Sequence, residues 1–101
     1  MLYQSERDQS SWQHLSLENT QEVIEILKLI EVFAQVKLPG NKTTDKLAYA
    51  PLDRILNFAA ELVENKQLWL AIPDTFLDGN GELVLKSELY EELGELIESC
   101  R

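Results

Sequence analysis

His14 and Cys100 are the one histidine and the one cysteine of the chain, and both side chains are common in catalysis and metal binding. A cysteine nucleophile needs a histidine as its base and a third group to orient that base, so these residues would have to meet from opposite ends of the chain. A zinc site needs several clustered cysteine or histidine ligands. The four glycines match neither a phosphate-binding loop nor a dinucleotide fingerprint. We therefore expect no enzymatic activity and no cofactor, and we expect Cys100 to be a small buried residue.

The segment 78–83, with the sequence DGNGEL, resembles the middle of an EF-hand calcium loop. With Gly81 at the sixth loop position, the loop would begin at Phe76 and end at Ser87, where an EF-hand has carboxylates. The resemblance is therefore confined to this segment, and weak calcium binding is kept as an alternative function. The same residues are also typical of the turn of a β-hairpin. The candidate calcium ligands are Asp74, Asp78, Asn80, Glu82 and Glu88.

Acidic residues outnumber basic residues by eighteen to nine, which gives a net charge of −9. Nucleic-acid backbones are bound by clustered lysine and arginine, but here the basic residues are spread singly, so we expect no direct nucleic-acid binding. An anionic membrane would also repel the chain. The acidic residues gather in the segment 74–101, which could dock a basic partner or mimic nucleic acid, although such surfaces are commonly just solvated. The candidate contact residues there are Glu91, Glu92, Glu95 and Glu98.

The length of 101 residues and the hydrophobic content of 45% are typical of one globular domain. Residues 1–15 are mostly polar and are interpreted as an N-terminal tail carrying Tyr3 and Trp12, followed by a single helical domain over 16–101. No segment approaches the roughly eighteen consecutive apolar residues of a membrane helix, and there is no signal-peptide pattern. A single cysteine forms no disulfide within a monomer, which fits a reducing compartment. We therefore expect a cytoplasmic protein.

The first predicted helix begins near Asn19 and ends at Val36 or Lys37. Asn19 and Glu22 have the spacing of a capping box, and the Pro39-Gly40 pair ends the helix. Its apolar residues span roughly 240° of the circumference, whereas a surface helix needs an arc of about 100°. Either the rest of the chain encloses this helix or its second side binds another protein. The residues expected at such an interface are Ile26, Leu29, Val32, Phe33 and Val36.

Further elements are predicted after this helix. Thr43, Thr44 or Asp45 caps a short helical turn, and a helix with Pro51 at its start runs to residues 65–67. The apolar run 68–72 is either a strand or the last turn of that helix. A β-hairpin follows around 78–81, and the last helix starts near Ser87. Gly94 either weakens this helix or lets a neighbour approach it closely.

These elements predict a mainly α-helical fold, in which three principal helices pack as a small orthogonal or bundle-like domain with a short β-hairpin before the last helix. The function that we expect is a non-enzymatic, acidic protein-interaction or regulatory module. A homodimer through the first helix is the leading form of this hypothesis. Weak calcium binding over 74–88, or acidic mimicry of nucleic acid, is the alternative.

Overall fold

The computed structural model describes residues 17–100. Their elements, in chain order, are α1 (Leu17–Lys28), a π-helical turn η1 (Leu29–Phe33), a 3-10 turn η2 (Pro39–Asn41), α2 (Thr44–Leu47), α3 (Leu52–Val63), α4 (Lys66–Ala71), β1 (Thr75–Leu77), β2 (Leu83–Leu85) and α5 (Lys86–Ser99). The predicted mainly helical fold with a hairpin before the last helix is confirmed. The predicted tail over 1–15, with Tyr3, Trp12 and His14, lies outside the described residues. Within the described part of the chain, no helix is long and apolar enough to cross a membrane.

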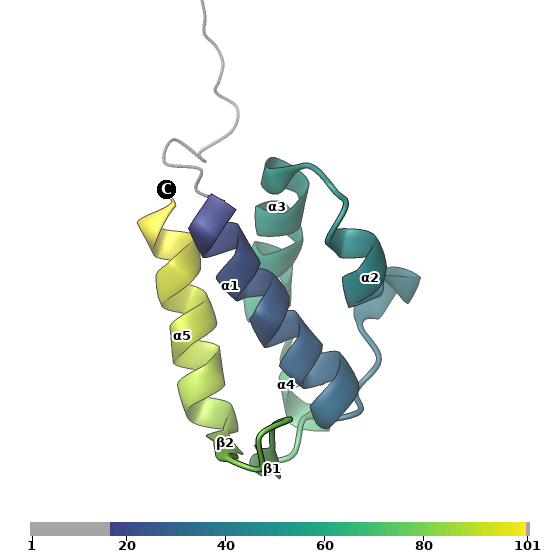
Figure 1. The fold of residues 1–101 in the computed structure, drawn as a ribbon, viewed down its shortest axis with the longest axis vertical. Helices are drawn as coiled ribbons and strands as arrows, with labels where there is room; N and C mark the ends of the chain where they lie inside the picture. The colour runs from purple at the N-terminus through teal and green to yellow at the C-terminus, as the bar shows by residue number, and fades with distance from the viewer. Residues whose placement is uncertain (1–16, 101) are drawn as a thin grey trace, which may run out of the picture.

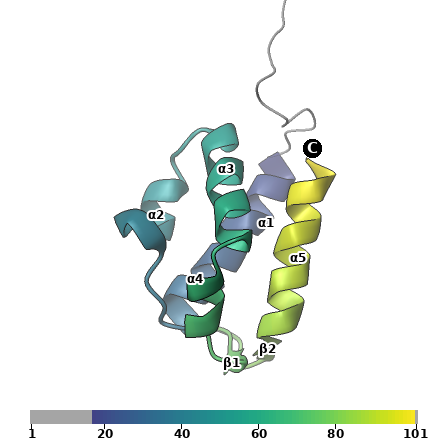
Figure 2. The same cartoon turned by 180° about the vertical axis from the view of Figure 1, so that it is seen from behind.

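The three long helices α1, α3 and α5 pack against one another and enclose the core. In Figure 1, α1 lies in front of α3 and beside α5, and Figure 2 shows α3 and α4 beside α5 from behind. Leu27, Leu56 and Leu93 contribute one fully buried leucine from each long helix. The wide apolar surface of α1 therefore meets neighbours within the same chain.

The first helix ends earlier than the sequence predicts. The α-helix ends at Lys28, and the wider π-helical turn η1 continues it to Phe33. The amide of Ala34 then donates to the carbonyl of Leu29 at 2.8 Å, and Gln35 takes a left-handed φ of 58°. A left-handed residue is a common way to end a helix, although glycine is the usual residue there. The helix thus stops before it reaches Pro39.

The start of the first helix also differs from the expectation, because Asn19 lies inside α1 and is not its cap. The Asn19 side-chain amide instead donates to Oγ of Ser99 at 2.9 Å and to Sγ of Cys100 at 3.5 Å. These hydrogen bonds join the beginning of α1 to the end of α5, which lie side by side in Figure 1. Cys100 is fully buried, so the expectation of a small buried residue is confirmed.

The short helix α2 has the predicted threonine cap, since Thr43 Oγ1 accepts from the amide of Lys46 at 3.3 Å. A second acceptor comes from the first helix. Oε1 of Glu31, in η1, accepts from the amide of Thr44 at 3.0 Å and from the hydroxyl of Thr44. Because the first amides of a helix have no partner inside it, Glu31 satisfies a donor of α2 and holds α2 against the first helix.

The apolar run from 68 to 71 lies in a separate short helix, with Ile72 directly after its end, and this helix is neither the predicted strand nor a continuation of α3. The helix α3 ends at Val63, and Asn65 caps α4 by accepting from the amide of Leu68 at 3.0 Å. The indole Nε1 of Trp69 donates to the carbonyl of Leu62 at 2.7 Å. This buried hydrogen bond fixes α4 against the end of α3.

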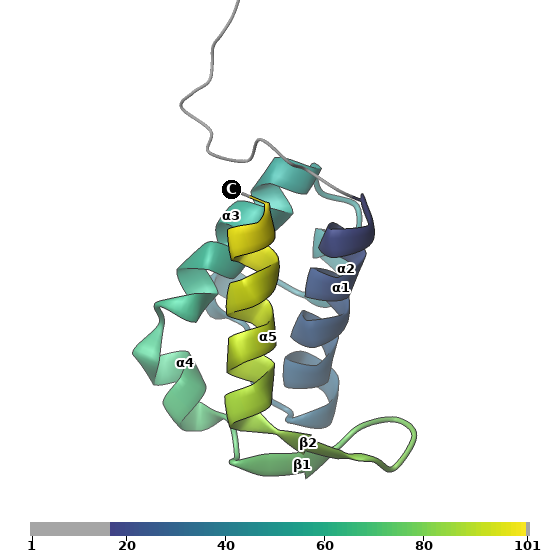
Figure 3. The same ribbon diagram turned by 90° about the vertical axis from the view of Figure 1, so that its left-hand side faces the viewer.

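The predicted hairpin is confirmed as an antiparallel pair in which Thr75 faces Leu85 and Leu77 faces Leu83. Phe76 points to the core, while Leu77 and Leu83 are exposed. The helix α5 follows β2 directly and has no side-chain cap, so Ser87 lies in its first turn and does not cap it. Figure 3 shows the hairpin beneath the start of α5 and the end of the first helix.

Candidate functional site

The candidate contact residues on the first helix are mostly covered by the chain itself. Ile26 is buried in the core, and Leu29, Phe33 and Val36 are partly buried against it. Val32 is the exception, with 47% of its surface exposed. Among the candidate contact residues, the apolar surface that this helix could offer to a second copy is therefore limited to Val32 and the exposed parts of its partly buried neighbours, and outside that set Leu17 at the start of α1 is 62% exposed.

The proposed calcium segment folds as a tight hairpin turn. Oδ1 of Asp78 accepts from the amides of Asn80 and Glu82 at 2.8 and 2.9 Å. The amide of Gly81 donates to the carbonyl of Asp78 at 3.1 Å, and Gly81 has a left-handed φ of 80°. The Asp78 carboxylate therefore stabilises the turn, which is the role expected of an aspartate at this position.

The remaining candidate ligands lie on other elements. Asp74 precedes β1, and its carboxylate pairs with Lys86, while Glu88 lies in the first turn of α5. The strand β1 thus separates Asp74 from Asp78. Among residues 17–100, no group of three or more histidine, cysteine, aspartate or glutamate side chains is placed to hold one metal ion. The structure places Asp78, Asn80 and Glu82 in one turn, and Asp74 and Glu88 on other segments.

The four glutamates predicted as partner contacts are all exposed on α5. Glu91, Glu95 and Glu98 follow one another at helical spacing and line a groove, whereas Glu92 does not line it. Residues three and four apart share one face of a helix, so the three carboxylates form one edge. This edge is the part of the predicted contact set that the fold places beside a concave surface.

We call this concave surface the α5 groove. It consists of three adjoining hollows of about 590, 480 and 310 Å³ that all include Tyr90. From α5 it is lined chiefly by Lys86, Tyr90, Glu91, Gly94, Glu95 and Glu98. From α3 and α4 it is lined by Ala60, Val63, Glu64, Lys66, Trp69 and Leu70. In Figure 3, α5 stands in front, with α3 and α4 beside it.

The surface of the groove combines apolar side chains with carboxylates. Leu70 is 80% exposed and Tyr90 is 43% exposed, and both belong to the hollow between α4 and α5. The residues that line the three hollows include five carboxylates and two lysines. The groove is therefore an apolar surface with a negative edge.

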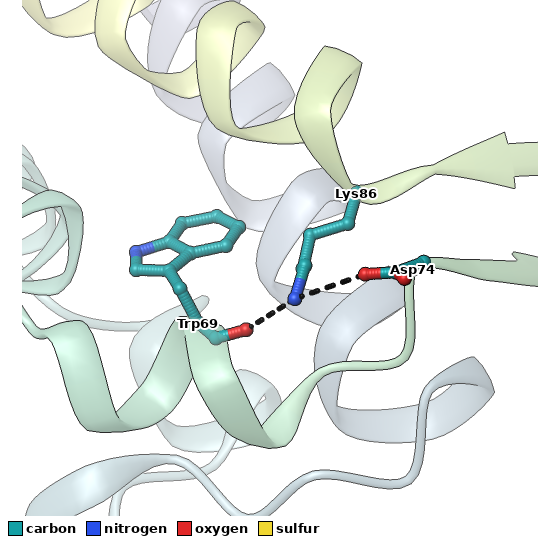
Figure 4. Close-up of polar contacts among 3 residues, drawn as sticks. All are labelled: Trp69, Asp74 and Lys86. Carbon is teal, nitrogen blue, oxygen red and sulfur yellow. Dashed lines mark hydrogen bonds and ion pairs between the residues drawn. The ribbon is translucent and has the colours of Figure 1, made fainter.

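A small polar network holds the α4 side of the groove in place. Nζ of Lys86 donates to the carbonyl of Trp69 at 2.8 Å and lies 3.4 Å from Oδ1 of Asp74, as Figure 4 shows. The ring of Trp69 also packs edge-on against the ring of Tyr90, with centroids 5.0 Å apart. The carbonyl of Trp69 lies in the last turn of α4, where a cation is favourable because helix carbonyls there lack partners. Lys86 thereby ties α4 to α5.

Sequence reasoning did not include Leu70, Tyr90 and Trp69 among the candidate site residues. The signal in the sequence was an aromatic residue, Tyr90, at the border between the apolar stripe and the glutamates of the last helix. Leu70 gave no such signal, because it belongs to the apolar run 68–72, which was predicted as a strand or as the last turn of a helix. In the structure, Leu70 lies on the exposed side of α4 and Trp69 on its buried side.

Comparisons of this chain with known protein-family models, with curated proteins and with solved structures gave no significant match.

Proposed function

We propose that this chain is a non-enzymatic protein-binding module that docks a basic segment of a partner protein in the α5 groove. The observation that carries the proposal is the exposed pair Leu70 and Tyr90 beside a row of carboxylates on one concave surface. Aromatic residues in pockets are frequent energetic centres of protein interfaces. Charged groups at the edge then steer and orient the partner.

The exposed side chains supply an apolar anchor for a partner, to which the charge of the groove adds. Burial of a leucine or a comparable side chain contributes about 1.5–3 kcal/mol. Leu70 is largely exposed, and the partly exposed ring of Tyr90 packs against Trp69. A partner side chain that contacts Leu70 and Tyr90 therefore meets an apolar surface that is already formed. A preformed site lowers the ordering cost of association.

A basic partner fits this groove better than a second copy of the chain. The net charge of −9 makes two copies repel each other at low salt. Two grooves placed face to face would also bring Glu91, Glu95 and Glu98 of one copy against those of the other.

The buried free thiol of Cys100 fits a reducing compartment, and a cytoplasmic location belongs to the proposal.

The test is the selection of binders from a displayed library of random peptides. We expect the selected peptides to be rich in lysine and arginine, to contain apolar residues, and to bind more weakly as salt rises. The variant E91Q/E95Q/E98Q should lose most of the binding. The matched variant D45N/D53N/E61Q removes three exposed carboxylates outside the groove and should retain it.

A substitution of the apolar surface separates this proposal from simple charge mimicry of nucleic acid. Leu70→Ser leaves the charge unchanged and should cost little stability, because the side chain is mostly exposed. A groove that needs an apolar anchor loses affinity with this change, whereas an acidic mimic does not. The proposal is wrong if no peptide is enriched, or if the two triple variants bind the selected peptides equally.

A further inference from the structure

No packing contact and no backbone conformation among the described residues requires a glycine at position 94. Gly94 lies within α5, where glycine weakens a helix relative to alanine. A β-carbon added to Gly94 would meet no atom within 4 Å, and the residue has no left-handed φ. Neither close packing nor backbone conformation therefore explains the glycine, in contrast to Gly79 and Gly81 in the hairpin turn.

The position of Gly94 in the α5 groove offers an explanation for a glycine within this helix. Gly94 lines the hollow of about 480 Å³ between α5 and α3, together with Ala60, Val63 and Tyr90. It lies one turn after Tyr90 on α5, and Glu91, Glu95 and Glu98 follow the same hollow. At Gly94 no side chain of α5 projects into this hollow, which lies between Tyr90 and the carboxylates of Glu95 and Glu98.

We infer that the occupant of the α5 groove is an amphipathic α-helix with a basic face, and that it crosses α5 at Gly94 with its backbone close to that of α5. This inference rests on the proposed function and specifies its partner. Small residues at a crossing point let two helices approach more closely than the usual 8–10 Å between axes. The apolar side chains of the partner would contact Leu70 and Tyr90, and its basic side chains would meet the α5 carboxylates.

A helix fits this groove better than an extended peptide because of its backbone. Around Gly94 and Leu70 the groove is bordered by side chains of α3, α4 and α5, whose backbone groups are bonded within helices, while the hairpin residues Thr75 and Leu85 border only the hollow of about 590 Å³. An extended peptide would leave its own amides and carbonyls without partners there, whereas a helix satisfies them internally. At about 1.5 Å per residue, the face of α5 from Lys86 to Glu98 is roughly 18 Å long and accommodates a helix of about twelve residues.

The test uses two synthetic peptides of about fourteen residues and identical composition, made of leucine, lysine and arginine. In the first, the leucines recur at helical spacing, and in the second they alternate as in a strand. We expect the full-length chain to bind the first peptide more tightly and to raise its helical circular-dichroism signal. Gly94→Ala should raise the melting temperature by a few degrees but weaken binding of this peptide roughly tenfold. Gln67→Ala, at an exposed helical position outside the groove, should leave binding unchanged.

The possible outcomes separate this inference from the function on which it rests. Equal binding by wild type and Gly94→Ala, combined with loss of binding in E91Q/E95Q/E98Q, would overturn the helix crossing and leave the docking function in place. Preference for the strand-patterned peptide would overturn the helical occupant in the same way. If neither peptide binds in a manner that E91Q/E95Q/E98Q weakens, the docking function itself is wrong.

Discussion

The ring of Phe33 packs against the backbone of Gly79, so closely that a β-carbon on Gly79 would stand 3.0 Å from Cζ of the ring. Phe33 ends the turn η1, and Gly79 lies at the tip of the hairpin. A two-stranded hairpin is marginally stable by itself, and this contact is one place where it rests on the helices. The same contact covers an apolar residue of the first helix that was expected to bind another protein.

Gly79→Ala is expected to lower the free energy of unfolding by about 1 kcal/mol, because the new methyl group forces the Phe33 ring out of its position. Urea unfolding followed by circular dichroism measures this change. In Phe33→Leu the ring is absent, so the added alanine should cost much less. The double-mutant cycle should give a coupling of at least about 0.5 kcal/mol.

Gly81 provides the control for this cycle. Gly81→Ala should also destabilise the protein by about 1 kcal/mol, because φ is 80° there, but no atom lies within 4 Å of the added carbon. Its effect should therefore be independent of Phe33. Equal coupling of both alanine variants to Phe33→Leu would contradict the packing explanation.

Gln35→Gly is expected to raise the free energy of unfolding by about 0.5–1 kcal/mol. Gln35 has a φ of 58°, which strains a residue with a β-carbon, whereas glycine adopts this conformation readily. Thermal unfolding should show a melting temperature higher by a few degrees. Gln67→Gly, inside α4, should have the opposite sign because glycine weakens a helix interior. A lower melting temperature for Gln35→Gly would count against a left-handed helix end.

Glu31→Ala is expected to cost about 1–3 kcal/mol, because the amide and hydroxyl of Thr44 lose their shared acceptor. Hydrogen exchange should show faster exchange at the Thr44 amide, since α2 is tied to the first helix through it. Glu25→Ala removes an exposed carboxylate from α1 and should change neither quantity by much. Unchanged protection of Thr44 in Glu31→Ala would show that α2 is held by other contacts.

The types of most elements follow from local patterns, with the separate helix α4 as the exception, whereas their ends depend on tertiary contacts. Local signals predict the helix with Pro51 at its start, the turn capped by Thr43 and the hairpin. The structure contains all three. The first helix ends early because η1, Gln35 and the Phe33 contact stop it, and no residue type in that stretch signals a stop. Asn19 has the spacing of a cap, but the end of α5 takes its hydrogen bonds.

The negative charge of the candidate site was predictable from the sequence, but the concave surface beside that charge was not. Glu91, Glu95 and Glu98 follow from helical spacing alone, and they line the α5 groove. The apolar half of the groove depends on how α4 turns after α3, which brings Trp69 beneath Tyr90 and leaves Leu70 exposed. The excess of apolar residues on the first helix was a real signal, but most of that surface is buried within the same chain.

Lys86→Met is expected to lower the free energy of unfolding by about 1 kcal/mol, since the carbonyl of Trp69 at the end of α4 loses its donor. Asp74→Asn is the matched control, because Asp74 is 93% exposed and a surface ion pair contributes little. Urea unfolding of both variants separates the two interactions of the ammonium group. If Asp74→Asn costs as much as Lys86→Met, the ion pair and not the carbonyl bond stabilises this junction.

Lys86→Met also separates the effect of Lys86 on folding stability from its effect on peptide binding to the groove. Lys86→Met removes a positive charge from the groove, so a basic peptide should bind somewhat more tightly to the folded variant at low salt, and the difference should disappear at high salt. Fluorescence anisotropy of a labelled basic peptide, measured well below the melting temperature, tests this expectation. Weaker binding by Lys86→Met would mean that the position of α4, which Lys86 fixes, matters more to the partner than the charge of the groove.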